Sequence, residues 1–296
     1  MPNLHKTAGR LKIAAAVLPV IDIKEDLNIV IDQSIHSALQ QATNGMVAGV
    51  DLPGLRITMP FDIAYSTFGL SPTSYAAATV IEGYLANIVA GTIDSASTHH
   101  KWAKTALCTA CAWVNTFSGQ EGGEIIAEVV VVFYSTDGDL DPITRTLNNA
   151  YPALSAIPAN HGIGVLTANA VAYDGVIGLR YAANLSMSIQ RVSGHPFPTG
   201  SIPSGMKPML SIDFSDPTTL AAVLASIGVK ITSTTTLTLL KYANSILSAT
   251  GKKTLTIAAG YVRPTPGSGK HGDLFKGGLD ILISSADGIT HGIVVS

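Results

Sequence analysis

The chain has 296 residues, of which only 13% are charged, and its 18 Lys and Arg against 20 Asp and Glu give a formal net charge of −2. A soluble globular domain has about 25% charged residues. The near-zero net charge and the lack of a basic block exclude the electrostatic attraction that nucleic acids and anionic membranes require. The shortage of charge indicates instead that copies of the chain, or partners, cover much of its surface.

The first apolar stretch, residues 13–21, has the appearance of a secretion signal. Pro19 interrupts it, and Asp22 and Lys24 follow where a cleavage site needs small residues, so we do not predict a signal peptide. No apolar stretch reaches the ~20 residues of a membrane-spanning helix.

Residues 26–43 carry apolar side chains near helical spacing, and Asn44 and Gly45 follow as a helix stop. This pattern predicts an N-terminal helix. From about residue 46, short runs rich in Val, Ile, Thr and Tyr alternate with Gly, Pro, Asn and Asp, which is typical of strands and turns.

Several runs alternate between apolar and polar residues, which predicts strands with one face on a core. The clearest are residues 185–190, 210–214 and 254–257. Residues 124–134 are apolar on both faces over 129–133, which predicts a strand buried on both sides.

Two helices are predicted among these strands, and each follows an alternating strand and a Pro-Thr pair. The first, over 72–90, follows strand 55–61, and the second, over 216–227, follows strand 209–214. This order indicates an internal repeat whose halves meet near residue 159, with coincidence as the alternative.

Two stretches dense in Gly and Pro, residues 194–205 and 263–272, are predicted to be long loops. Long loops without structure of their own are usually functional or ordered by a partner, so we expect both to contact neighbouring subunits. A short helix is predicted over 142–149, after a polar turn.

The sequence nominates no catalytic, cofactor-binding or metal-binding residue. Gly267 to Lys270 fails as a phosphate loop because Pro264 and His271 occupy two of the defining positions. Cys108 and Cys111 have the spacing of redox and zinc motifs, but a second Cys pair is absent. A buried structural pair is the favoured interpretation, with a disulfide or redox role and a metal role as alternatives.

Other candidates for chemistry are His99 and His100, the only adjacent histidines, and the carboxylates of Asp137, Asp139 and Asp141. The carboxylate spacing is similar to that of a calcium loop, but the twelfth position is not Glu. We therefore interpret this segment as a solvated turn.

The order of elements after residue 160, which is strand, Pro-rich loop, strand, Pro-started helix and four further strands, resembles the tail-tube-like structural proteins of tailed bacteriophages. These proteins stack as rings, commonly hexameric, through β-barrel or sandwich domains with one packed helix. The resemblance implies a non-enzymatic homo-oligomer that contacts other tail proteins of a virion, is made in the host cytoplasm, and uses no cofactor. The N-terminal part is longer than a simple tube subunit needs, so a distal tail adaptor or another virion component is an alternative.

The predicted fold class is mainly β with a few helices, built from antiparallel sandwich or barrel modules that each pack one helix. The predicted domains are a helical arm over 1–45, a β-rich module over 46–158 with helix 72–90, and a tail-tube-like module over 159–296 with helix 216–227.

Three other functions remain open. A β-rich capsid or surface protein that binds glycans should be rich in aromatic residues, and only 6% of this chain is aromatic. A hydrolase without a recognisable motif, for instance a glycosidase, needs only one pair of carboxylates, which composition cannot exclude. An outer-membrane barrel is disfavoured by the doubtful export signal and the predicted helices.

Overall fold

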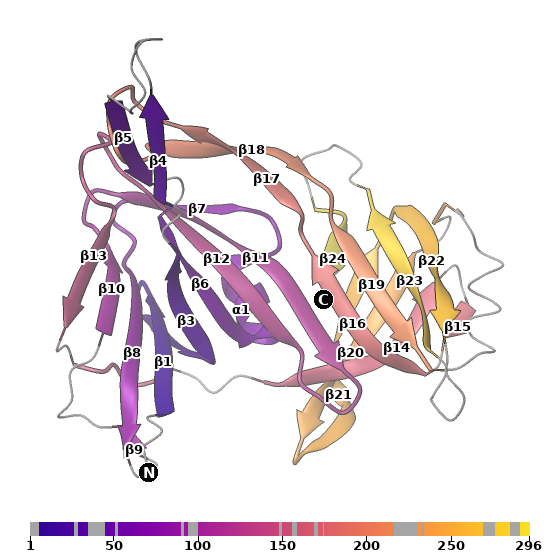
Figure 1. Ribbon diagram of the computed structural model, residues 1–296. Helices are drawn as coiled ribbons and strands as arrows, with labels where there is room; N and C mark the ends of the chain where they lie inside the picture. Colours follow the sequence, from indigo (N-terminus) through magenta and orange to yellow (C-terminus); the bar gives the residue numbers. More distant parts are fainter. Residues whose placement is uncertain are drawn as a thin grey trace.

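The protein is mainly β and its sheets are antiparallel, as a computed structural model shows (Figure 1). The structure describes residues 6–26, 29–34, 45–50, 53–89, 92–93, 100–147, 150–155, 159–168, 171–173, 175–215, 230–231, 234–268, 276–284 and 291–296. Within these ranges there is one helix, α1 (Phe61–Phe68), and no sheet closes into a barrel.

The longest sheet, called here the central sheet, extends across much of the molecule (Figure 1). Its strands, in spatial order, are β22 (Gly260–Ser268), β23 (Lys276–Ile283), β19 (Met209–Phe214), β16 (Val176–Ala182), β11 (Thr109–Gln120), β12 (Ile126–Tyr134), β6 (Gly54–Pro60) and β3 (Asp22–Asp26). A short ninth strand, β7 (Thr73–Tyr75), pairs with the first part of β11. The two edges of this sheet are therefore β22 and β3.

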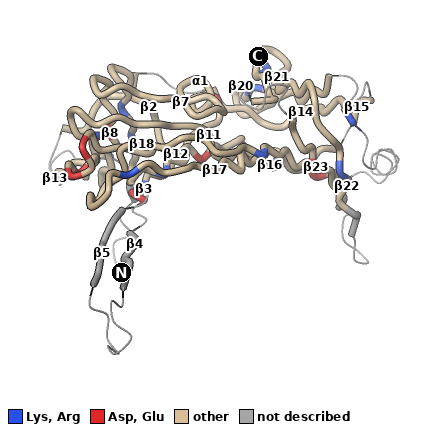
Figure 2. The backbone as a smooth tube through the Cα atoms, turned by 90° about the horizontal axis from the view of Figure 1, so that it is seen from above, with Lys and Arg blue, Asp and Glu red and all other residues tan. Residues whose placement is uncertain are grey.

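Two smaller sheets pack side by side on one face of the central sheet (Figure 2). The first outer sheet contains β13 (Ile143–Leu147), β10 (His100–Lys104), β8 (Ile81–Val89), β1 (Lys6–Ile13) and β2 (Ala16–Val20), with β9 (Thr92–Ile93) paired to β8. The second outer sheet contains β15 (Val171–Tyr173), β14 (His161–Ala168), β20 (Thr235–Ala243), β21 (Ile246–Ile257) and β24 (Ile293–Val295). Two hairpins, β4 (Ile29–Ser34) with β5 (Gly45–Val50) and β17 (Leu185–Gln190) with β18 (Gly200–Met206), complete the described strands.

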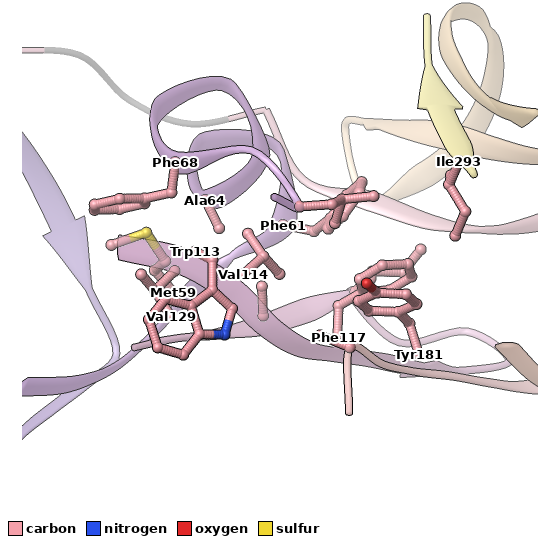
Figure 3. Packing of buried hydrophobic residues seen from close by; sticks show 14 of the residues in the cluster. Met59, Phe61, Ala64, Phe68, Trp113, Val114, Phe117, Val129, Tyr181 and Ile293 are labelled. Carbon is pink, nitrogen blue, oxygen red and sulfur yellow. The ribbon is translucent and has the colours of Figure 1, made fainter. Parts of the chain in front are cut away.

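Helix α1 lies on the same face of the central sheet, between the two outer sheets (Figure 1). Residues at its two ends determine where the helix begins and ends. Pro60 precedes it, and Asp62 lies in the first turn near the positive end of the helix dipole. Gly69, with φ 69°, ends it. The helix buries Phe61, Ala64 and Phe68 against the sheet (Figure 3).

The core lies between the central sheet and this second layer. Val129, Val131 and Phe133 of β12 are all fully buried on the core face, while Val132 on the opposite face is also buried and Val130 is half-buried. Burial on both faces is confirmed from Val131 to the end of the strand, whereas Glu128 and Val130 on the outer face are half-buried.

The two halves of the chain have matching strand pairings. Strand pairs of the N-terminal half have counterparts in the C-terminal half, both in the central sheet and in the outer sheets. The matched pairs are β1–β2 with β14–β15, β1–β8 with β14–β20, β8–β10 with β20–β21, β10–β13 with β21–β24, β3–β6 with β16–β19, β6–β12 with β19–β23, β11–β12 with β22–β23, and β4–β5 with β17–β18.

The match extends to single residues. Ile57 faces Val129 across β6 and β12, and Ile212 faces Leu279 across β19 and β23. Just before these strands, the carbonyl oxygen of Pro53 accepts a 2.8 Å hydrogen bond from the Phe133 N–H. The carbonyl oxygen of Pro208 accepts a 3.1 Å bond from the equivalent Ile283 N–H. Strands β6 and β19, whose likeness indicated a repeat in the sequence, thus occupy equivalent places.

The β17–β18 hairpin is anchored to the end of β12. The Tyr134 hydroxyl forms a hydrogen bond with Ser201 Oγ, and the Ser135 N–H donates to the Pro198 carbonyl at 2.9 Å. Burial raises the pKa of Tyr134 to about 12. In addition, Leu185 and Met187 pack against the core.

We expect Tyr134→Phe to lower the free energy of unfolding by about 1 kcal/mol, because one hydrogen bond of a buried hydroxyl is lost while the ring stays in place. Urea unfolding gives the measurement, with Ser201→Ala as the matched variant. Once either partner is gone, the second change should cost little more, so strictly additive losses in the double variant would show that the two hydroxyls are not coupled.

Three sequence predictions of helices are corrected by the structure. The helix over 26–43 is wrong where the chain is described, since Ile29–Ser34 is strand β4. The helix over 72–90 is wrong because β7 and β8 occupy most of that range, and their hydrogen bonds to β11 and β1 outweigh the helix propensity of the Ala-rich segment. The short helix over 142–149 is replaced by β13. The helix over 216–227 lies outside the described residues.

The two predicted loops are also shorter than expected. Residues 200–206 form β18, and residues 263–268 belong to β22. Both proline-containing segments pair on one side only among the described residues, which is the setting in which a sheet accepts proline.

Candidate functional site

The most informative site is the junction at which the two halves meet within the central sheet. Strand β11 of the N-terminal half pairs antiparallel with β16 of the C-terminal half, from Thr116 opposite Ala182 to Gln120 opposite Gly178. The Ala183 N–H donates to the Asn115 carbonyl at 2.9 Å, so Thr116 and Ala182 form the neighbouring pair without hydrogen bonds between them.

The junction is also packed on the core face. Phe117 stacks on Tyr181 with 4.7 Å between ring centroids and meets Phe61 of α1 at 4.5 Å (Figure 3). Beyond it, the Tyr181 hydroxyl forms a hydrogen bond with Nε2 of the buried His291. One edge of each half is therefore joined to the other half by backbone bonds and by a continuous aromatic core.

The equivalent edges at the two ends of the central sheet are open. Strand β22 corresponds to β11, and β3 corresponds to β16, yet the described part of the chain places no strand against the outer side of β3. On β22 only the start is covered, by an isolated bridge between Lys230 and Tyr261. Unpaired backbone N–H and C=O groups at such edges are available to another chain.

The face of the central sheet that points away from the outer sheets carries ionic groups (Figure 2). Near one end, Arg56 pairs with Asp26 at 2.5 Å and with Glu128 at 3.4 Å, and the hydrogen bond to Asp26 raises the pKa of Arg56. At the other end, Arg263 pairs with Asp280 at 2.6 Å. These pairs suit a water-facing surface, with charges of both signs.

Two open cavities border the turn over residues 121–124. The larger, about 1000 Å³, lies along β11, β16, β19 and β23 and includes Glu121, Arg180 and Asp213. The smaller, about 570 Å³, is lined by Glu124, Asn160 and Lys241 among others.

The groove around Asp213 has a glycine floor. A Cβ atom at Gly178 would lie 2.7 Å from the Asp213 carboxylate, and one at Gly278 would lie 2.8 Å from the Ile212 carbonyl oxygen. These glycines leave room for the carboxylate of Asp213 beside the strands.

Cys108 and Cys111 are both buried free thiols, in agreement with the favoured interpretation. Burial raises the pKa of Cys111 to about 11 and also raises the pKa of Cys108, so both thiols stay protonated at neutral pH. His100 stacks on Trp102, with 6.0 Å between their ring centroids, and His99 lies outside the described residues.

The three aspartates of the predicted turn point to different partners. Asp137 accepts hydrogen bonds from the N–H groups of Asp139 and Leu140, which lower its pKa. Asp139 lies 2.8 Å from His195 Nδ1, and Asp141 pairs with Arg145 at 2.7 Å. Their carboxylates organise the turn and the start of β13.

Of the Gly267 to Lys270 segment, Gly267 and Ser268 end strand β22 and the remainder lies outside the described residues. No group of three or more His, Cys, Asp or Glu side chains among the described residues is placed to hold a metal ion. In the same part of the chain, no helix has the length and hydrophobicity to cross a membrane.

The geometry described above is the main evidence about the function of the chain. The sequence matches no protein-family model and no curated protein.

Proposed function

We propose that this chain is a structural subunit that assembles with copies of itself into a ring or tube. Its proposed place is in a virion, as a tail-tube or tail-adaptor protein of a tailed bacteriophage that also contacts other tail proteins. One observation carries the proposal: the central sheet already contains an edge-to-edge joint between two like halves, and the two strands equivalent to that joint lie at its open ends.

The geometry of the two ends supports assembly of a head-to-tail kind. Because β22 and β3 are different edges, the contact that joins them is heterologous, and repetition of a heterologous contact gives a ring when the rotation closes and a filament when it does not. A twofold dimer would need one edge to pair with itself. The two unlike ends therefore favour a ring or tube.

The composition supports the same function. A chain with 13% charged residues gains solubility when its edges and apolar side chains are covered. Several such side chains stand at exposed places, with Ile246 at the tip of the β20–β21 hairpin 72% exposed and Val294 on β24 61% exposed. Coverage by neighbouring subunits accounts for both features.

Size-exclusion chromatography with light scattering, followed by negative-stain imaging of the full chain, tests the proposed function. We expect particles of several subunits whose images show rings or tubes. A monodisperse monomer at every concentration from about 1 to 100 μM would contradict it, because interfaces between obligate subunits persist at such dilution.

A further inference from the structure

We propose that strand β22 of one copy pairs antiparallel with strand β3 of the next, in the register that β11 and β16 already use inside each chain. This inference rests on the proposed self-assembly and specifies its contact. The partner is a second copy of the chain, and the residue pairs that meet follow from the matched halves.

The register on the β3 side comes from the pairing with the neighbouring strand. Ile23 lies opposite Ile57, and Leu179 lies opposite Ile212, so β3 and β16 superimpose with Ile23 at the place of Leu179. It follows that Lys24 takes the place of Arg180 and Asp26 takes the place of Ala182.

The register on the β22 side is fixed in the same way. Thr116 lies opposite Glu128, which directly precedes Val129, and Thr265 lies opposite Gly278, which directly precedes Leu279. Thr265 therefore takes the place of Thr116. Since Thr116 faces Ala182 at the junction, Thr265 of one copy should face Asp26 of the next.

The part of β22 that this pairing uses is the part left open. In the N-terminal half, β7 covers residues 110–112 of β11 before β16 takes over at Thr116. In the C-terminal half, the bridge from Lys230 reaches Tyr261, the equivalent of Cys111, and Thr265 is exposed. Among the described residues, each strand is thus covered at its start within its own half, and only β11 has a partner further along.

The proline at the centre of β22 is compatible with this contact. Pro264 faces Leu279 as Val114 faces Val129, so Pro264 stands at the place of Val114. The Val114 N–H donates at 2.9 Å to the Gly69 carbonyl, within its own half, and not to β16. A proline there removes no bond of the junction type, whereas Pro266, directly after Thr265, has no N–H to donate and leaves the contact one backbone bond short of the junction.

Charges on the uncovered face agree with the same register. Asp26 and Thr265 would form a directly opposed pair, which places Arg263 diagonally across from Asp26, within reach of a long side chain. Arg263 is paired to Asp280 and Asp26 to Arg56, so the contact would join two ion pairs into one row of alternating sign.

Disulfide trapping tests the register. Thr116 and Ala182 form a pair without hydrogen bonds, so the proposed equivalent has a Cα separation of about 4.5 Å, within the range that a disulfide spans. Thr265→Cys and Asp26→Cys are made as separate single variants, mixed in denaturant, refolded together and oxidised mildly. We expect about half of the chains to form a covalent dimer linking one chain of each kind, as seen on non-reducing gels and by peptide mapping, because random mixing places an Asp26→Cys chain beside about half of the Thr265→Cys chains.

Two controls match this experiment. Thr265→Cys mixed with Asp22→Cys moves one thiol four residues, about 13 Å, along the same face of β3, and should give no more than about a tenth of the cross-linked product. The double variant Thr116→Cys/Ala182→Cys should close the same disulfide within one chain and shows that the oxidation conditions suffice.

The outcomes separate the inference from the proposed function, because light scattering is measured on the unmodified chain. Oligomers without a Thr265–Asp26 cross-link, in conditions where the internal control closes, would overturn the register and leave self-assembly standing. Equal cross-linking through Asp22 would also overturn it. A monomeric chain would overturn both. If a single variant does not fold, its exposed neighbour Arg263→Cys or Lys24→Cys replaces it, and a short bifunctional thiol cross-linker joins the diagonal pair Arg263 and Asp26, or Thr265 and Lys24, with the same controls.

Discussion

Replacing Phe117 with alanine should cost about 3–5 kcal/mol of the free energy of unfolding, the largest single effect we expect from a side-chain truncation. Phe117 is only 1% exposed and lies between Phe61 and Tyr181, at ring-centroid distances of 4.5 and 4.7 Å. Its removal leaves a cavity beneath α1 and ends two aromatic contacts, each worth about 0.5–1.5 kcal/mol beyond simple burial. Urea unfolding followed by tryptophan fluorescence measures the loss.

The position of Phe117 makes the result informative about the junction as well as the core. Because its neighbours come from both halves, a destabilised junction should expose β11 and β16 together in hydrogen exchange. Phe117→Leu should recover about half of the loss, and Lys252→Ala, at an exposed position of β21, should change stability by less than about 0.5 kcal/mol. A Phe117→Ala protein within about 1 kcal/mol of the wild type would show that the two halves are held together elsewhere.

The strands were predictable from sequence wherever one face is apolar and the other polar. Met209–Phe214 alternates because Leu210, Ile212 and Phe214 face the core, and the same holds for Leu255 and Ile257 in β21. In these segments the local pattern and the tertiary burial agree, so the period-two signal was sufficient.

The helix errors arose where local propensity and tertiary pairing disagree. Residues 26–43 place apolar side chains at helical intervals, but Ile29 and Ile31 also satisfy a strand, and short apolar runs do not separate the two. Of the helix that does form, α1, only Phe61 was assigned, to the end of strand 55–61, and residues 62–68 were assigned to no element. Pro60, Asp62 and Gly69 were its available signals, at positions typical of a helix start and stop.

The candidate interface could not be predicted from the sequence. The internal repeat on which it depends was nevertheless indicated there, by the likeness of strands 55–61 and 209–214. The pairing of β11 with β16 joins residues about 60 positions apart, and nothing in either segment specifies the other. A strand lies at the edge of a sheet only because no further strand pairs with it, and the strand's own sequence does not show this. Thr265 and Asp26 therefore have no local signature and become candidates only once the order of the whole sheet is known.

Acidification should destabilise the fold through His291. The His291 ring is buried beside Tyr181, and the Ile293 N–H donates to its Nδ1 at 3.2 Å, so the neutral ring carries its proton on Nε2. Burial lowers the pKa of His291 to about 4 from the ordinary 6.5. Below pH 6.5, His291 of the unfolded chain therefore binds a proton, whereas His291 of the folded protein stays neutral down to about pH 4. The free energy of unfolding falls over this range, by about 3 kcal/mol in total.

The measurement is urea unfolding at pH 7, 5.5 and 4.5, at one protein concentration because assembly adds its own stability. His291→Asn keeps an acceptor for the Ile293 N–H and removes the titrating ring, so it should be less stable at pH 7 but lose less on acidification than the wild type. Tyr181→Phe is the matched variant, since it removes the hydroxyl but leaves the buried ring of His291 to titrate. If His291→Asn loses as much stability between pH 7 and 4.5 as the wild type, the acid sensitivity belongs to other groups and not to His291.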